Sequence, residues 1–163
     1  MSVELAKRYY RLALFCARKD DLSGAVKYAQ RSLRLNADDA SARKLLGLCL
    51  YELGELDGAL SAFEGSAEFS EEVRSELKRT GETLKRAREL ASGKKWRKAD
   101  ALLRGDVRQS VKILNIRGCV KAASGRRRAA AQLFALALEK DVGNHAVVEY
   151  LAQVSGAPPR VTL

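Results

Sequence analysis

Two runs of basic residues carry the strongest chemical signal in this sequence of 163 residues. Each run stands at the expected start of a helix, where the peptide dipoles favour negative charge. A cation there costs a few tenths to about 1 kcal/mol, and the cost falls when an anion docks on the free backbone N–H groups. We therefore predict an anion-binding edge formed by Lys94, Lys95, Arg97, Lys98, Arg126, Arg127 and Arg128.

The distribution of charge along the chain also indicates that an electrostatic function belongs to this region. The net charge is +10, and residues 1–70 contain ten Lys/Arg and ten Asp/Glu, whereas residues 71–163 contain twenty and ten. All of the excess positive charge therefore lies in the second part. A solvated surface is the alternative interpretation, because charged runs on helices usually need no ligand. Trp96 could stack on a nucleic-acid base, but its position favours packing in the core.

Residues typical of catalytic or metal sites are few. His145 is the only histidine, and it follows the expected helix cap Asn144, so we expect it on the surface. Cys16, Cys49 and Cys119 are far apart in helical apolar patterns, which predicts free, buried thiols. No short motif combines a nucleophile with a base. The sequence predicts no enzyme, no metal site and no cofactor.

A repeating helical pattern between Ala6 and Ser70 positions the rest of the chain. A shift of 34 residues superposes Ala6 on Ala40, Leu12 on Leu46, Leu22 on Leu56, and Gly24-Ala25 on Gly58-Ala59. Helices are expected near Glu4 to Arg18, Leu22 to Leu35, Asp39 to Leu53, and Leu56 to about Phe69. Gly47 indicates a close approach of two helices, and Gly54 indicates a left-handed helix end.

The register changes after Ser70. A long helix is expected from Glu71 to about Ala91, with a seam of Val73, Leu77, Thr80, Leu84, Ala87 and Ala91 that could also pair with a second copy of the chain. A short helix from Lys95 to Leu103, a further hairpin from Val111 and a last helix from Asn144 to Val154 follow. We expect one helical repeat domain over residues 1–155 and a Pro-containing tail or linker over residues 156–163.

The repeated positions resemble those of the tetratricopeptide repeat (TPR) family. The residues that carry the resemblance are Leu46, Gly47, Gly54, Ala59 and Phe63, with Leu12, Ala13, Ala25 and Leu33 in the first copy. Ala37 departs from the pattern, since the family usually has Pro there. The resemblance implies an all-α fold, a right-handed solenoid of about four helical hairpins with a C-terminal capping helix.

In that family the first helix of each hairpin lines a concave groove. The matching residues here are Lys7, Tyr10, Leu14, Ser41, Lys44, Leu48, Tyr51, Leu84, Arg88, Lys112 and Asn115. Their mixture of aromatic, aliphatic and cationic groups suits a peptide with apolar anchors and some negative charge. Alternatively, most of them pack against the neighbouring hairpin. Tyr10 and Leu14 stand where some members carry the Lys and Asn that grip a C-terminal carboxylate, so this mode is not predicted.

The sequence as a whole predicts a non-catalytic adaptor or scaffold that binds a protein or peptide partner with an acidic segment, through the groove and the basic edge. A nucleic-acid-binding or anionic-surface-binding module is the alternative. No apolar run approaches the roughly 20 residues that cross a bilayer, and the charged N-terminus lacks the apolar core of a signal peptide. We therefore expect a cytoplasmic protein without a membrane span.

Overall fold

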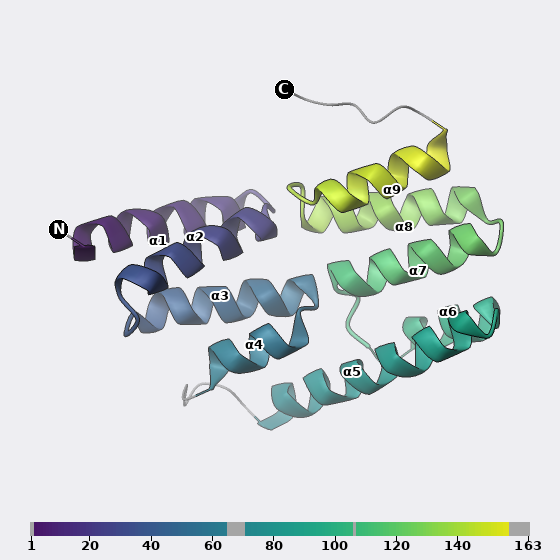
Figure 1. Ribbon diagram of the computed structural model, residues 1–163, viewed down its shortest axis with the longest axis horizontal. Coiled ribbons are helices and arrows are strands. Elements are labelled where there is room, and N and C mark those ends of the chain that lie inside the picture. The colour runs from purple at the N-terminus through teal and green to yellow at the C-terminus, as the bar shows by residue number, and fades with distance from the viewer. Residues whose placement is uncertain (1, 65–70, 106, 157–163) are drawn as a thin grey trace. The chain divides into compact units, whose positions relative to one another are not determined.

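The computed structural model describes residues 2–64, 71–105 and 107–156 of the chain, and all regular secondary structure in these residues is helical (Figure 1). The predicted all-α class is therefore confirmed. Contacts divide the chain into two compact units. The first unit consists of Met1–Leu77 with Lys140–Gly143, and the second of Lys78–Glu139 with Asn144–Leu163. None of the described helices has the length and apolar composition needed to cross a membrane.

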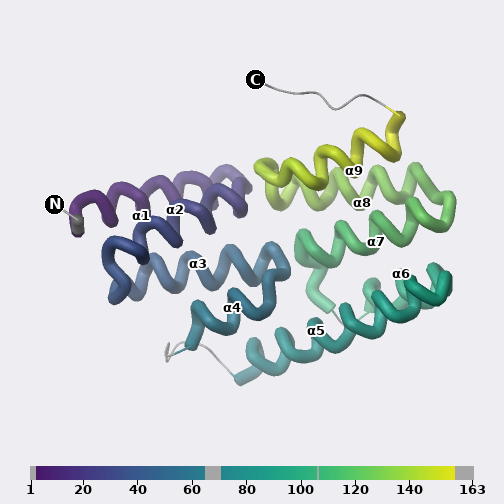
Figure 2. Tube along the Cα trace, viewed as in Figure 1, coloured from purple at the N-terminus to yellow at the C-terminus, as the bar shows by residue number. Residues whose placement is uncertain are grey.

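The first unit contains two helical hairpins and the start of a long helix. Its helices are α1 (Ser2–Arg18), α2 (Leu22–Leu35), α3 (Ala40–Leu53), α4 (Leu56–Phe63) and the first turns of α5 (Glu71–Ser92). From α1 to α4, each helix packs against the next one along the chain (Figures 1 and 2). The expected bounds are confirmed to within two residues for α1, α2 and α3. The part of the fourth helix that we expected beyond Glu64 lies outside the described residues.

A glycine determines how closely the second hairpin closes. A Cβ atom built on Gly47 would lie 2.3 Å from Cε1 of Phe63, so only glycine lets α3 approach this ring. Phe63 forms a buried cluster with Ala59 and Leu77, which brings the start of α5 into the core of the first unit. The close approach predicted at Gly47 is therefore confirmed.

The second unit repeats the hairpin with different lengths. Its helices are α6 (Trp96–Arg104), α7 (Val111–Ala123), α8 (Arg127–Lys140) and α9 (His145–Ser155), together with the remaining turns of α5. Gly118 on α7 corresponds to Gly47, because its Cβ would lie 2.5 Å from Cε1 of Phe134. The Phe134 ring also packs on Tyr150 of α9, with 5.6 Å between the ring centroids. Asn144 caps α9 as predicted, accepting a hydrogen bond from the Val147 N–H.

The four hairpins of the described chain use the same turn. In each, a residue with positive φ stands one or two positions after the end of the first helix: Asp20, Gly54, Lys94 or Gly125. The N–H of the following residue then donates to a carbonyl five residues earlier, in the pairs Asp21 to Cys16, Glu55 to Leu50, Lys95 to Leu90, and Arg126 to Lys121, at 2.8–3.0 Å. These bonds satisfy the last carbonyls of one helix and fix where the next begins. The left-handed conformation predicted at Gly54 is confirmed.

The seam predicted on α5 is covered by the chain itself. Leu77, Thr80, Leu84 and Ala87 are buried, and Val73 and Ala91 are half-buried. The spacing of the seam therefore reflects packing within the monomer.

The prediction for the cysteines is partly wrong. All three are free, but only Cys49 is buried, whereas Cys16 is half-buried and Cys119 is exposed. Cys119 directly follows Gly118, and successive helical residues point about 100° apart, so the close contact at Gly118 does not bury its neighbour. Burial, and then the negative charges of Glu52 and Asp141, raise the pKa of the Cys49 thiol to about 11. His145 is exposed, as predicted.

Replacing Gly47 by Ala should destabilise the first unit. The new methyl group would clash with the buried Phe63 ring, and overpacking of this kind costs about 1–3 kcal/mol. Thermal unfolding followed by circular dichroism measures the change. Gly93→Ala is the matched control, because its Cβ would meet nothing closer than 3.6 Å. Equal stability of the two variants would contradict the close approach.

The three thiols should react with a maleimide at different rates near neutral pH. Cys119 is exposed and should react first, whereas Cys49 should stay unmodified in the folded protein because its thiol is buried and its pKa is raised to about 11. Mass spectrometry of peptides after timed labelling distinguishes them. Early modification of Cys49 would show that this packing is wrong.

Candidate anion-binding pocket

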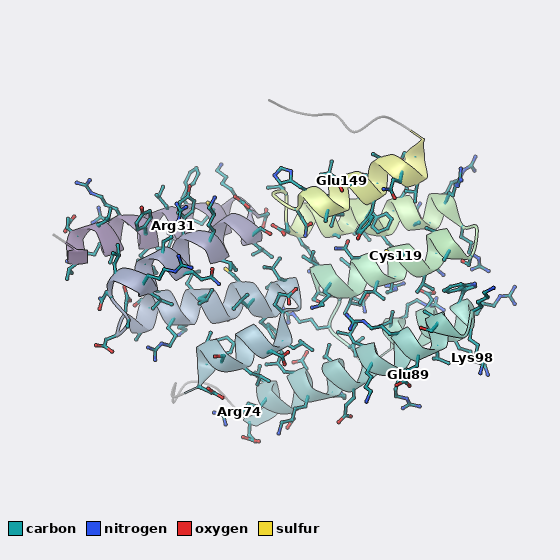
Figure 3. All side chains as sticks on the ribbon, viewed as in Figure 1. Arg31, Arg74, Glu89, Lys98, Cys119 and Glu149 are labelled. Carbon is teal, nitrogen blue, oxygen red and sulfur yellow. The ribbon has the colours of Figure 1, made fainter. Side chains whose placement is uncertain are left out.

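The two basic turns of the second unit line one pocket. The α5–α6 turn and the α7–α8 turn lie at the same end of that unit (Figure 1), and Lys98 projects from α6 there (Figure 3). The pocket has a volume of about 680 Å³. We call it the basic pocket; its lining consists of Lys94, Lys95, Trp96, Arg97, Lys98, Asp100, Val120, Lys121, Ala123, Ser124 and Arg126.

The helices that begin at the pocket lack the side-chain caps that α2, α3, α7 and α9 have, and α4 also begins without one. Asp21 caps α2 by accepting the Gly24 N–H at 2.8 Å, and the Asp141 carboxylate accepts the Ser23 N–H at 3.0 Å. At the equivalent place before α6 stands Lys95, whose side chain makes no capping hydrogen bond. Arg126, whose carbonyl accepts the first hydrogen bond of α8, also has only donors in its side chain. Neither helix start therefore has a side chain at its cap position that satisfies the first backbone N–H groups.

The outer cations of the pocket have no carboxylate partner among the residues that the structure describes. In the described residues no carboxylate pairs with any of the five, which are Lys94, Lys95, Arg97, Lys98 and Arg126. With Lys121 the lining holds six cations against the single carboxylate of Asp100, a balance of +5. The surface potential here is therefore positive and suited to an anion.

Asp100 neutralises the inner cations instead. Its carboxylate is 3% exposed and accepts hydrogen bonds from Lys121 Nζ at 2.6 Å and Arg117 Nε at 3.2 Å, with Arg104 Nε at 3.4 Å. Arg117 also donates to Gln109 Oε1 at 2.7 Å. Burial alone would raise the pKa of the Asp100 carboxyl, but hydrogen bonds and charge from Lys121 and Arg117 outweigh it, so the pKa lies below its ordinary value.

The structure does not bring all predicted edge residues to the pocket. Lys94, Lys95, Arg97, Lys98 and Arg126 line it, whereas Arg127 and Arg128 are exposed outside the lining. Trp96, which we expected in the core, is half-buried and forms part of the lining.

Two charged residues of the pocket, Asp100 and Lys121, were missed by the sequence analysis. Asp100 is the only acid between Lys94 and Arg104, an isolation that could have marked it as an ion-pair partner. Lys121 stands in the last turn of its helix, where a cation suits the helix dipole, and so gave no signal of a site.

The predicted groove residues fall in both units. In the first, α1 packs against α3, and these two helices carry Lys7, Tyr10, Leu14, Ser41, Lys44, Leu48 and Tyr51. Leu48 is an exposed large apolar residue, and the Tyr51 hydroxyl donates to Glu76 at 2.6 Å. In the second unit Leu84 is buried, Arg88 is exposed, and Lys112 and Asn115 are half-buried. The described residues contain no cluster of His, Cys, Asp and Glu that could hold a metal ion.

No family model matches the chain, and no curated protein matches its sequence. Solved structures do resemble it. The TPR domain of P58(IPK) superposes with a TM-score of 0.55 at 14% identity, over 91% of this chain and 45% of that one. A thermophilic TPR protein of Thermus thermophilus matches with a TM-score of 0.44 at 16% identity, over 92% of this chain and 98% of that one.

The likeness to the P58(IPK) domain shows a TPR-like fold, as the sequence predicted. This chain spans less than half the length of that domain. The resemblance concerns the path of the helices, because the identity is low. It assigns no ligand to the basic pocket.

Replacing Asp100 by Asn should destabilise the second unit by about 3 kcal/mol at pH 7, because it removes one partner of a buried charge network. The native pKa of Asp100 is lowered, so its stabilisation is complete above the ordinary carboxyl value of about 3.9 and is lost as the pH falls through the native pKa. The difference in the free energy of unfolding between wild type and variant should therefore become smaller only below about pH 4.

Urea unfolding at pH 7 and at acidic pH tests this, with the fluorescence of Trp96 as a signal from the second unit itself. Glu149→Gln removes an exposed carboxylate on α9 and is the matched control. If Asp100→Asn has no more effect than this control, the carboxylate does not hold the pocket together.

Proposed function

We propose that this chain is a non-catalytic adaptor or scaffold and that its basic pocket receives an acidic segment of a protein partner. The observation that carries the proposal is the convergence of two basic turns on one pocket whose outer cations have no carboxylate partner in the described chain. Helical repeat folds commonly present extended surfaces to other macromolecules, which fits such a role.

Affinity for an acidic segment should depend on the number of cations around the pocket more than on any single cation. An exposed ion pair contributes about 0.2–1 kcal/mol, since water competes with it. Five outer cations and two uncapped helix starts around one pocket can instead act on several carboxylates at once. A segment with several acidic residues is therefore a better ligand than an isolated anion.

A protein segment fits this surface better than a nucleic-acid strand does. Nucleic acid carries one charge about every 3.4 Å along each strand and favours a continuous basic track. The outer cations instead gather around a pocket, and the Asp100 carboxylate lies within its lining. Binding of nucleic acid is therefore the alternative outcome of the binding experiment.

The exposed faces of α1 and α3 are proposed as a second part of the binding surface. Lys7, Lys44 and Leu48 are exposed there, and Tyr10 and Leu14 are half-buried. Apolar and cationic groups on adjacent helices suit a peptide that has both apolar and acidic residues. This face lies in the first unit and can be tested independently of the basic pocket.

Replacing Lys95 and Arg126 together by Ala should weaken binding of an acidic peptide about tenfold, the loss of two exposed charge contacts. The probe is a short fluorescein-labelled peptide of Glu and Ala, measured by fluorescence anisotropy at low and at physiological salt. Wild-type affinity should fall as salt increases, because exposed charges are screened.

The control is Arg8→Ala with Lys27→Ala, which removes two exposed cations of the first unit and the same total charge. It should leave the affinity nearly unchanged. If both double variants weaken binding equally, the attraction is only that of net charge and the pocket is not the site. If single-stranded RNA binds and the acidic peptide does not, the proposed partner class is wrong.

A further inference from the structure

The basic pocket also has an apolar side. Trp96 is the first residue of α6 and is half-buried, and Ala123 on α7 is exposed, whereas Val120, one turn earlier on the same helix face, is only 4% exposed. The aliphatic stems of neighbouring lysines add further apolar surface, since lysine keeps only its terminal charge fully hydrated. The lining therefore combines an apolar wall with a cationic rim.

The indole of Trp96 is larger than the fold requires at this position. Trp96 follows the helix start at Lys95 in the same way that Leu22 follows Asp21 and Leu56 follows Glu55. A leucine is therefore large enough to complete the packing at the equivalent position of two other hairpins. Tryptophan adds a large apolar face with an N–H group and is typical of sites where an apolar group of a ligand is buried.

We infer that the acidic segment carries a large apolar or aromatic side chain, which packs on Trp96 and Ala123 while flanking carboxylates pair with the cations of the rim. This inference rests on the proposed function and specifies its ligand. The pocket volume of about 680 Å³ falls within the roughly 300–1,000 Å³ of pockets that enclose small ligands. One apolar side chain with its acidic neighbours is a ligand of matching chemistry and scale.

An exclusively charged ligand would leave this wall unused. Carboxylates gain nothing from covering an indole or the Ala123 methyl group, and an acidic side chain over them would lose water without a partner. An apolar side chain gains affinity from the same surface. Charge should therefore bring the segment to the pocket, and the apolar anchor should determine which acidic segments stay bound.

The chain has one tryptophan, so its fluorescence reports the pocket directly. The probes are two peptides of equal length and charge, rich in Glu, with a central Phe in one and Ala in the other. The Phe peptide should bind about tenfold tighter or more, as expected for burial of a Phe side chain. It should also shift the Trp96 emission to shorter wavelength, because the peptide excludes water from the indole.

Trp96→Leu supplies the residue that α2 and α4 have at this place, so the variant should fold. Calorimetric titration of Trp96→Leu should give nearly equal affinities for the Phe and Ala peptides. Phe15→Leu replaces an aromatic residue that is 61% exposed on α1 and is the matched control; it should keep the preference for Phe. Lys95→Ala with Arg126→Ala should weaken both peptides and keep their ratio.

The outcomes separate this inference from the proposed function. If the two peptides bind wild type equally and leave the Trp96 emission unchanged, the apolar anchor is wrong while the acidic-segment site stands. If neither peptide binds, both proposals are overturned. Wild-type emission answers the question even if Trp96→Leu does not fold.

Discussion

The hydrogen bond that closes each hairpin turn is the constraint on which the candidate site depends. In all four turns of the described chain a residue with positive φ is followed by an N–H that donates five residues back, so the next helix starts at a fixed place. Asp21, Glu55, Lys95 and Arg126 are therefore equivalent in structure although they differ in charge. The fold sets the position, and the side chain there sets the local charge and the capping: Asp21 caps α2, whereas Glu55 and Lys95 make no capping hydrogen bond.

Asp100 explains how so many cations can be held together. Its buried carboxylate takes up the charge of Lys121 and Arg117, which would otherwise repel their neighbours at the inner side of the pocket. The cations of the outer rim receive no such partner in the described residues. The pocket thus separates charge used for stability from charge that remains for binding.

Much of the fold could be predicted from the sequence, because helical periodicity and small residues at close contacts are local signals. Gly47 and Gly54 predicted a close approach and a left-handed turn, and both are found. The conformation of the third turn, between α5 and α6, could not be predicted from the sequence in this way. There the left-handed residue is Lys94, although Gly93 precedes it, and a positive φ for a lysine has no local signal.

The site was only partly predictable for a different reason. The basic runs are visible in the sequence, but the partnership of Asp100 with Lys121 joins residues 21 positions apart and depends on how α6 packs against α7. Cys119 was misjudged because an apolar helical pattern does not distinguish a residue in the core from its exposed neighbour. Packing between two helices decided the first case, and side-chain direction around one helix decided the second.

The most direct test of the central claim is an amide chemical-shift titration of the whole chain with an acidic peptide. The account predicts that the largest shifts fall on the N–H groups of residues 96–98 and 127–129, which form the first turns of α6 and α8. The N–H groups of Ser23 and Gly24, already bonded to carboxylates, should change little. Shifts spread evenly over the surface, or absent from both uncapped helix starts, would contradict it.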